Sequence, residues 1–411
     1  MIFLYKRIIF TFIYVTLFII NYNFIYGNFD DITEKSAIVL DSDGLSILYN
    51  KDMNKKIFPA STTKILTAIL VIENLNLDSN ITVSNEALLN VPYGSSIIYL
   101  KQGEILTVRQ LLYGLLLPSG SDAANVLAEA VSGSIPNFAI LMNKKLEELG
   151  CINTHFVNPH GFHDDNHYST AYDMALIMRY ASQNETFRTI CETKEYVIEE
   201  TNKTLVPRNL ENTDLLLANK LNYVLGGKTG YTAEAGNVFI CYSSLNGNNI
   251  VCCVYDGLKN ILSKKTRFID TKMLLDNSFE NFNKTKIIDK DTFKISYIDK
   301  KSKKNYILGI DKDIYCLTDK NPYILSYTLS DISINDNVVD GKIYVNVKNN
   351  NWQLNNTYEL QLIETKAYSD KNNNSNTYLL YISVMLIILI IILLNVRNKI
   401  NRNNKLYRRK K

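Results

Sequence analysis

The sequence predicts an α+β fold in which strands from both ends of one large domain flank a block of helices. Two observations favour this fold. Apolar runs with strand character occur at residues 37–52 and again at 236–258, and the chain between them carries apolar residues at helical spacing. A composition of 46% apolar and 21% charged residues over 411 positions is that of a folded protein, with length for two domains.

Strands and then helices account for the first part of this domain. The stretch AIVLDSDGLSILYNKD at 37–52 predicts two strands joined by a turn at Asp43-Gly44. A helical pattern follows from about Ala60 to Leu75. Further runs with helical spacing lie at 106–117, 121–133, 137–150 and 169–184.

The end of the domain returns to strands. GNVFICYSSL at 236–245 and NIVCCVYDGL at 249–258 are apolar runs separated by a turn-forming Asn-Gly-Asn-Asn, and a helix is expected near 264–279. We therefore expect one domain over 28–282. From 284 to 368 the sequence changes to short alternating runs between Asn-, Asp- and Lys-rich turns, which predicts a small β-rich domain.

The N-terminus has the pattern of a secretory signal. Within residues 1–27, Lys6 and Arg7 precede an apolar core from Ile8 to Ile20, and Gly27 offers a small residue for cleavage. The alternative is an uncleaved N-terminal anchor, because a clear Ala-x-Ala site is missing.

The C-terminus predicts a membrane anchor. After a polar linker at 369–377, the nineteen residues 378–396 carry no charge and match the ~20 that span a bilayer as a helix. Eight Lys or Arg residues and no acid follow at 397–411, so the positive-inside rule places this tail in the cytoplasm. We expect a cell-membrane protein with a single C-terminal anchor and its large domain outside the cytoplasm.

Charge and cysteine usage exclude some partners. Of the formal charge of +4, eight positive charges lie in the tail and two in the signal, which leaves −6 for the exported part. Nothing therefore argues for a nucleic-acid partner. The six cysteines show no CxxC spacing, so most are expected to be buried thiols, with one disulfide outside the membrane left open.

A histidine-rich stretch, HFVNPHGFHDDNH, raises the alternative of a metal site. It contains all four histidines of the chain: His155, His160, His163 and His167. The stretch has no His-Glu-x-x-His motif, and Pro159 and Gly161 prevent regular ligand spacing on a helix. We expect neither a metal nor a cofactor.

A serine and a lysine stand three residues apart at the start of the first long helix. In PASTTK, Ser61 and Lys64 would share one face of that helix, within reach of each other. A lysine takes a proton from a serine only if its pKa is lowered, and the apolar helix supplies the desolvation for this. The alternative is a Ser/Thr cap followed by a lysine that extends to solvent.

Two further motifs supply partners for this pair. Ser119, in LPSGSD between two helical patterns, could relay protons, and Gly227-Lys228-Thr229-Gly230-Tyr231-Thr232 stands immediately before a strand. The second motif offers a cation, a hydroxyl and a backbone edge, which suit a substrate carboxylate and an extended peptide. The motifs follow Ser61 in order, with Ser119 58 residues after it and Lys228 a further 109 residues on.

This set of motifs resembles that of the penicillin-recognising serine enzymes, whose signature is Ser-x-x-Lys, Ser-x-Asn and Lys-Thr-Gly. The wording PASTTKILTA, NPHGF, NHYSTAYDMALI and GGKTGYTAEAG is most similar to the low-molecular-mass penicillin-binding proteins that act as D-alanyl-D-alanine carboxypeptidases. The resemblance covers about residues 35–282. It implies an antiparallel sheet with helices on both sides, of the penicillin-binding/β-lactamase-like transpeptidase type.

The resemblance also implies roles by position. Ser61 would be the nucleophile that forms an acyl-enzyme, Lys64 its general base and Ser119 the proton relay. Lys228 and Thr229, in the Lys-Thr-Gly motif with Gly230, would hold the terminal carboxylate of the substrate.

Two further features of the site follow from the same resemblance. The backbone N–H groups of Ser61 and Tyr231 would form an oxyanion hole, and Arg267 would help to hold the carboxylate. The sequence departs from the family at Ser121, where asparagine is expected. Serine is shorter and loses the two-ended reach of the amide, so reduced activity or altered specificity is expected.

The expected function is removal of the terminal D-alanine from peptidoglycan stem peptides, with β-lactams acylating the same serine. Three alternatives stay open: a β-lactamase, a DD-endopeptidase, and a β-lactam-binding sensor without peptide turnover. A β-lactamase needs a placed carboxylate, and no motif assigns Glu147, Glu148 or Glu185 to that role. A sensor is suggested by Ser121, although a tail of 15 residues is too short for a signalling domain. A wall scaffold would leave Ser61 and Lys64 unexplained.

Overall fold

A computed structural model describes the chain from residue 32 to residue 367 with five internal gaps. The described ranges are 32–219, 221–255, 265–299, 304–330, 332–335 and 338–367. The predicted signal peptide, linker, membrane helix and tail lie outside them. Within the described part, none of the helices has the length and apolar character needed to cross a membrane.

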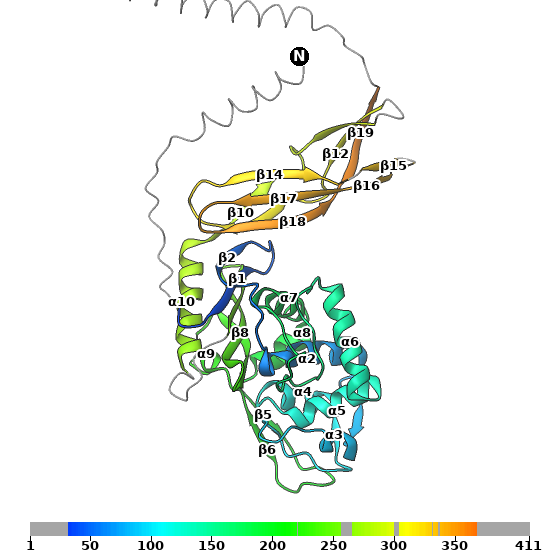
Figure 1. Cartoon of the computed structure of the whole chain (residues 1–411), viewed down its shortest axis with the longest axis vertical. Coiled ribbons are helices and arrows are strands. Elements are labelled where there is room, and N and C mark those ends of the chain that lie inside the picture. Colours follow the sequence, from blue (N-terminus) through cyan, green and yellow to red (C-terminus); the bar gives the residue numbers. More distant parts are fainter. Residues whose placement is uncertain are drawn as a thin grey trace, which may run out of the picture. The chain divides into compact units, whose positions relative to one another are not determined.

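Five antiparallel strands, at one end of an eight-stranded sheet, lie beside the site (Figure 1). In spatial order they are β2 (Ile47–Lys51), β1 (Ser36–Asp41), β9 (Asn248–Tyr255), β8 (Gly236–Leu245) and β7 (Val224–Thr232). The predicted strand pair in residues 37–52 is confirmed as β1 and β2, and the two later runs as β8 and β9. The Lys-Thr-Gly motif was expected just before a strand, but it lies within β7 at the edge of this sheet.

Helices account for the middle of the chain, as the spacing predicted. A 3-10 turn, η1 (Ala60–Thr63), leads into α2 (Lys64–Asn74). The other helices are α3 (Asn85–Leu89), α4 (Val108–Leu116), α5 (Ser121–Ser132), α6 (Ile135–Glu148), α7 (Ala171–Ala181), α8 (Glu185–Glu192), α9 (Leu215–Ala218) and α10 (Thr266–Asn281). Side-chain caps fix several starts; the Thr107 hydroxyl and the Gln110 side chain form a capping box at α4.

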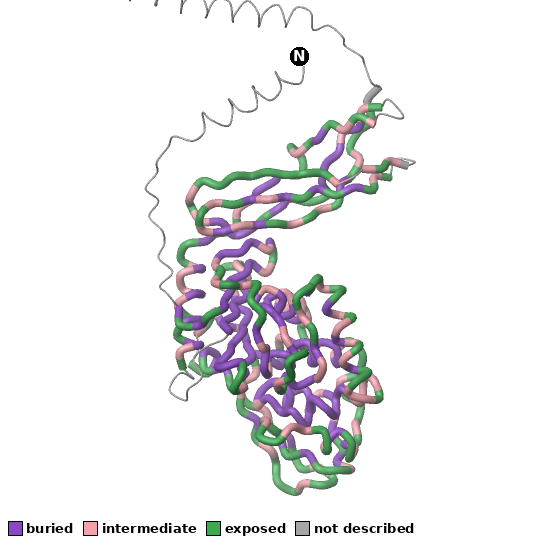
Figure 2. Tube along the Cα trace, viewed as in Figure 1, coloured by how far each residue is buried: buried purple, intermediate pink, exposed green. Residues whose placement is uncertain are grey.

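The sheet carries helices on both faces, which confirms the predicted α+β fold. Alternate residues of β8 show this: Val238 and Ile240 join the apolar core formed with α2, α4, α5 and α7. Phe239, between them, contacts the ring of Phe268 on α10. Because side chains alternate along a strand, one strand buries both of its faces. Figure 2 shows the resulting concentration of buried segments.

Two short hairpins lie beside the helices. Their strands are β3 (Asn80–Thr82) with β4 (Ile105–Thr107), and β5 (Glu195–Ile198) with β6 (Arg208–Glu211). All six cysteines are described, and all are buried free thiols. Burial raises the pKa of each of these thiols, so a structural role is favoured.

The chain after Asn281 is rich in strands and contributes to two compact units. The first unit contains the chain up to Phe293 with 310–334 and 339–360. Its later strands are β10 (Asn283–Ile288), β13 (Ile314–Thr318), β14 (Ile324–Leu329), β17 (Lys342–Lys348) and β18 (Gln353–Glu359). The second unit contains β11 (Ile295–Asp299), β12 (Lys304–Gly309) and β19 (Gln361–Ala367), which pair antiparallel. Two short strands, β15 (Ser333–Asn335) and β16 (Val338–Asp340), complete the set. The predicted domain boundary after residue 282 stays a prediction.

Candidate active site

Ser61 and Lys64 lie at the junction of η1 and α2. In a 3-10 turn, residues three apart are eclipsed, which brings both side chains to one side. Lys64 Nζ is 3.0 Å from Ser61 Oγ and donates to the backbone oxygen of His160 at 2.8 Å. A third contact, of 3.4 Å, joins it to Ser121 Oγ. The amine of Lys64 is therefore in contact with three oxygen atoms.

The environment of Lys64 favours its neutral form. The side chain is 1% exposed, and burial lowers its pKa well below the ordinary value. The charge of Lys228 lowers this pKa further, whereas Asp122 opposes the shift. A neutral amine has two N–H groups, which can serve His160 and Ser121, and one lone pair. That lone pair is then available for the hydroxyl proton of Ser61.

The NPHGF loop supports the turn that carries Ser61. Gly161 has a positive φ of 79°, and a Cβ added there would lie 1.8 Å from the backbone oxygen of Ala60. Only glycine fits this close approach. The loop therefore fixes the His160 carbonyl that accepts from Lys64.

The buried histidines of this region are neutral. Burial lowers the pKa of His167 to about 3 and that of His160 well below its usual range. His167 Nδ1 accepts from the Val157 N–H at 3.1 Å, so Nε2 carries the proton and donates to Thr63 Oγ1 at 2.8 Å. In the described ranges, no group of three or more His, Cys, Asp or Glu side chains is placed to hold a metal ion.

Ser119 has a strained backbone conformation just before the N-terminus of α5. Its φ of 71° lies in the left-handed region, which non-glycine residues rarely adopt. The side chain is buried, and Oγ has no hydrogen-bond partner among the described residues. Since Ser119 also lines the pocket, its hydroxyl can form a hydrogen bond with a ligand bound there.

The strand β7 supplies the third side of the site. Lys228 is 1% exposed, its Nζ donates to the Thr229 backbone oxygen at 3.2 Å, and burial lowers its pKa to about 7. Arg267, on α10, donates through Nη1 to the backbone oxygens of Gly230 and Val238 at 3.0 and 3.3 Å. Two cationic side chains therefore support the same short stretch of strand.

Gly230 brings the backbone of β7 against the nucleophile. A Cβ added to Gly230 would lie 2.9 Å from the backbone nitrogen of Ser61 and 2.7 Å from Val238 Cγ2. The absence of a side chain thus keeps open the space in front of the Ser61 N–H. Tyr231 follows directly, so the N–H groups named for an oxyanion hole belong to neighbouring segments.

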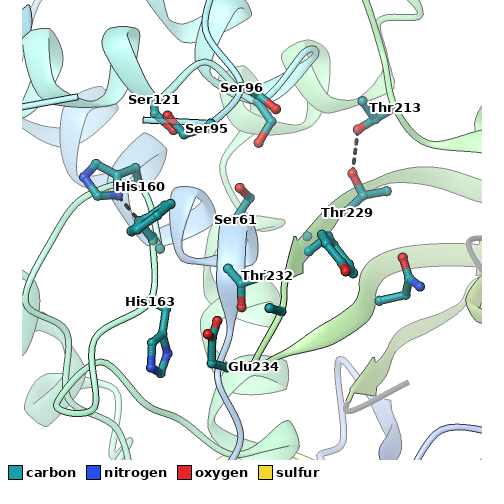
Figure 3. A pocket seen from close by; sticks show the side chains of 18 of the residues that line it. Ser61, Ser95, Ser96, Ser121, His160, His163, Thr213, Thr229, Thr232 and Glu234 are labelled. Carbon is teal, nitrogen blue, oxygen red and sulfur yellow. Dashed lines mark hydrogen bonds between the residues drawn. The ribbon is translucent and has the colours of Figure 1, made fainter. Parts of the chain in front are cut away.

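A cavity of about 820 Å³ connects these elements. All three motifs contribute to its wall, with Ser61, Ser119, Ser121, Thr229, Tyr231 and Arg267 among its residues. Figure 3 shows Ser61 at its centre, between Ser121 and His160 on one side and Thr229 on the other. Lys64 and Lys228 are buried and are not among its lining residues.

Some lining residues were not predicted. Ser95, Ser96 and Thr213 line the pocket from loops outside the quoted motifs, and Glu234 lies within GGKTGYTAEAG but was given no role. The only local signal for Thr213 is its place before Asp214, which caps α9.

Comparison with known proteins agrees with this geometry. The profile of the family described as D-alanyl-D-alanine carboxypeptidase matches residues 26–258. The chain belongs to the D-alanyl-D-alanine carboxypeptidase family. The prediction of a low-molecular-mass penicillin-binding protein is confirmed.

Relatives of this family extend the likeness along most of the chain. The D-alanyl-D-alanine carboxypeptidase DacF of Bacillus subtilis is 33% identical over 311 residues, which is 74% of this chain and 77% of that protein. DacA of Escherichia coli K12 is 30% identical over 296 residues, 69% of this chain and 70% of that one. The crystal structure of the Streptomyces K15 DD-transpeptidase is similar with a TM-score of 0.57 and 31% identity, over 61% of this chain and 98% of that one.

Ser121 stands where the resemblance to the family led us to expect asparagine. It is 2% exposed at the first turn of α5, and its N–H donates to the Ser96 carbonyl at 2.7 Å. Its hydroxyl reaches Lys64 at 3.4 Å, the longest of the three contacts of that amine. Serine therefore keeps a contact to the lysine, but its single hydroxyl has less reach into the pocket than an amide would have.

Proposed function

We propose that this carboxypeptidase removes the terminal D-alanine from peptidoglycan stem peptides through an acyl-enzyme on Ser61. The observation that carries the proposal is the 3.0 Å contact between Ser61 Oγ and the buried Nζ of Lys64. It joins a nucleophile in the wall of a cavity of about 820 Å³ to a desolvated base.

The geometry supports the following course of acylation. Lys64 accepts the hydroxyl proton as Ser61 Oγ bonds to the carbonyl carbon of the penultimate D-alanine. The backbone N–H groups of Ser61 and Tyr231 stabilise the negative charge on the carbonyl oxygen. Ser119 relays a proton to the nitrogen of the departing D-alanine as the peptide bond breaks, and water then hydrolyses the ester on Ser61.

Recognition of the substrate terminus falls to β7. Its edge can pair with an extended peptide, because β8 occupies one side of the strand. The Thr229 hydroxyl and the charges of Lys228 and Arg267 favour a carboxylate. A β-lactam combines such a carboxylate with a strained amide, so we expect it to acylate the same serine.

The cellular setting is also a proposal. The sequence at 1–27 supports export, and the apolar run at 378–396 with its basic tail supports a C-terminal anchor in the cell membrane. The β-rich region at 284–368 would then connect the catalytic domain to the anchor outside the cytoplasm. Deletion of residues after Asn376 tests this by releasing an active enzyme from the membrane.

The function is tested with the purified ectodomain, a peptide ending in D-Ala-D-Ala and a labelled penicillin. We expect release of D-alanine and labelling, and loss of both in Ser61→Ala. Labelling without D-alanine release supports the sensor, and rapid penicillin hydrolysis supports the β-lactamase. The three glutamates considered for that second activity do not line the pocket formed by the described residues. If wild type neither releases D-alanine nor is labelled by penicillin, the proposal is refuted.

The pH dependence of acylation should reveal the coupling between the two lysines. The charge on Lys228 lowers the pKa of Lys64, so Lys228→Met should raise that pKa. Lys64 then becomes neutral only at higher pH, so the acidic limb of the pH profile of acylation moves to higher pH. Lys228 has a pKa of about 7, so the shift is expected where wild type still carries this charge, below about pH 7.

The measurement is the second-order rate constant of acylation between pH 4 and 9. A penicillin methyl ester serves as reagent, because it removes carboxylate binding from the comparison. Lys145→Met, on α6, provides a lysine control outside the pocket. If the midpoint pH stays the same or falls in Lys228→Met, the charge of Lys228 does not lower the pKa of Lys64, and the prediction is wrong.

A further inference from the structure

Thr213 links the second and third motifs although it belongs to neither. Its Oγ1 lies 2.7 Å from Thr229 Oγ1, and the dashed line in Figure 3 marks this contact. On the other side, its backbone N–H and its hydroxyl reach the Leu117 oxygen at 3.3 and 3.4 Å. Leu117 begins the turn that holds Ser119. Thr213 is thus the contact between that turn and the strand β7.

The neighbours of Thr213 hold it in place from both sides. The Asn212 amide donates to two backbone oxygens at the end of α8, at 3.1 and 2.9 Å. Asp214 caps α9, since its Oδ1 accepts two backbone N–H groups at 2.9 and 3.2 Å. The position of the Thr213 hydroxyl is therefore fixed before any ligand enters the pocket.

The two hydroxyls have two possible arrangements of their protons. If Thr229 donates to Thr213, then Thr213 donates to the Leu117 oxygen, and Thr229 presents only lone pairs to the pocket. If Thr213 donates to Thr229, the proton of Thr229 is free to point into the pocket. Only the second arrangement suits an anion, because a carboxylate accepts hydrogen bonds and cannot donate them.

We propose that Thr213 is a positioning residue that directs the Thr229 proton toward the substrate carboxylate, so that the site prefers anionic to neutral termini. This inference rests on the proposed function of the same site. Thr213 is exposed where it lines the pocket. A bound substrate would cover the pair, and donation from Thr213 would strengthen the bond that Thr229 makes.

The test compares two reagents on three proteins. Acylation rate constants are measured with benzylpenicillin and with its methyl ester, for wild type, Thr213→Val and Thr213→Ser. Valine keeps the shape and removes the hydroxyl, whereas serine keeps the hydroxyl. We divide the rate constant for benzylpenicillin by that for its methyl ester. We expect this ratio to fall about three- to tenfold in Thr213→Val and to stay near the wild-type value in Thr213→Ser.

A double substitution separates positioning from general damage. In a Thr229→Val background, Thr213→Val should not lower the ratio further, because the hydroxyl that it directs is absent. An equal loss with both reagents, or an unchanged ratio, would overturn the inference. Should valine prevent folding, Thr213→Ala gives the same comparison. If wild type is not acylated at all, the proposed function fails instead.

Discussion

Replacing Lys64 with methionine will lower the acylation rate of Ser61 by about 10³-fold, within the range that a positioned general base contributes. Methionine fills a similar volume but has no lone pair basic enough to accept the Ser61 proton. The nucleophile then stays a hydroxyl with its ordinary reactivity. The measurement is the rate of labelling by a fluorescent penicillin under single-turnover conditions, with Lys145→Met as the control.

The fold should tolerate this change. Lys64 is buried in an apolar part of α2, and its lowered pKa means that the unfolded chain binds the proton more readily than the native protein. In wild type, this group therefore makes the free energy of unfolding increase as the pH rises toward 10.5. Lys64→Met lacks that part of the pH dependence. If the variant folds and keeps more than about a tenth of the rate, another group accepts the proton.

Gly230→Ala should be almost as damaging, by a different mechanism. The added methyl group would lie 2.9 Å from the Ser61 nitrogen and 3.0 Å from Ala60 Cβ, so β7 and η1 must separate or the Ser61 N–H must be covered. Either outcome removes an oxyanion donor, which typically costs about 10²- to 10³-fold in rate. We expect this loss in D-alanine release and in penicillin acylation alike.

The matched control is a glycine in open space. Nothing lies within 4 Å of a Cβ added to Gly133, the C-cap of α5, although its φ of 75° makes alanine mildly strained there. Gly133→Ala should lose about 1 kcal/mol of stability and keep its activity. Retention of wild-type acylation by Gly230→Ala would show that substrate does not approach along this part of β7.

Local patterns in the sequence were sufficient for much of the fold. Alternation and turn residues predicted β1, β2, β8 and β9, because these strands are bounded by clear turns. The glycine-rich β7 was missed as a strand, since glycine has low strand propensity, although β7 pairs with the next strand along the chain, β8.

The site divides in the same way. Ser61 and Lys64 were predicted together because two positions three residues apart in a helical turn lie on the same face. Ser121 was named as a departure, but its 3.4 Å contact with Lys64 joins residues 57 positions apart. No signal in the sequence pointed to a role for Thr213 in the site, because that role depends on contact with Leu117 and Thr229, which lie on separate segments.

The sequence by itself determined which groups are present and in what order: a nucleophile with a lysine one turn away, a second serine, and a cation with a hydroxyl before a glycine. These follow from spacing within single elements. Only the tertiary structure decided the state of those groups, because burial of Lys64 and Lys228, the strained backbone of Ser119 and the approach of Gly230 to Ser61 all arise where distant segments pack together.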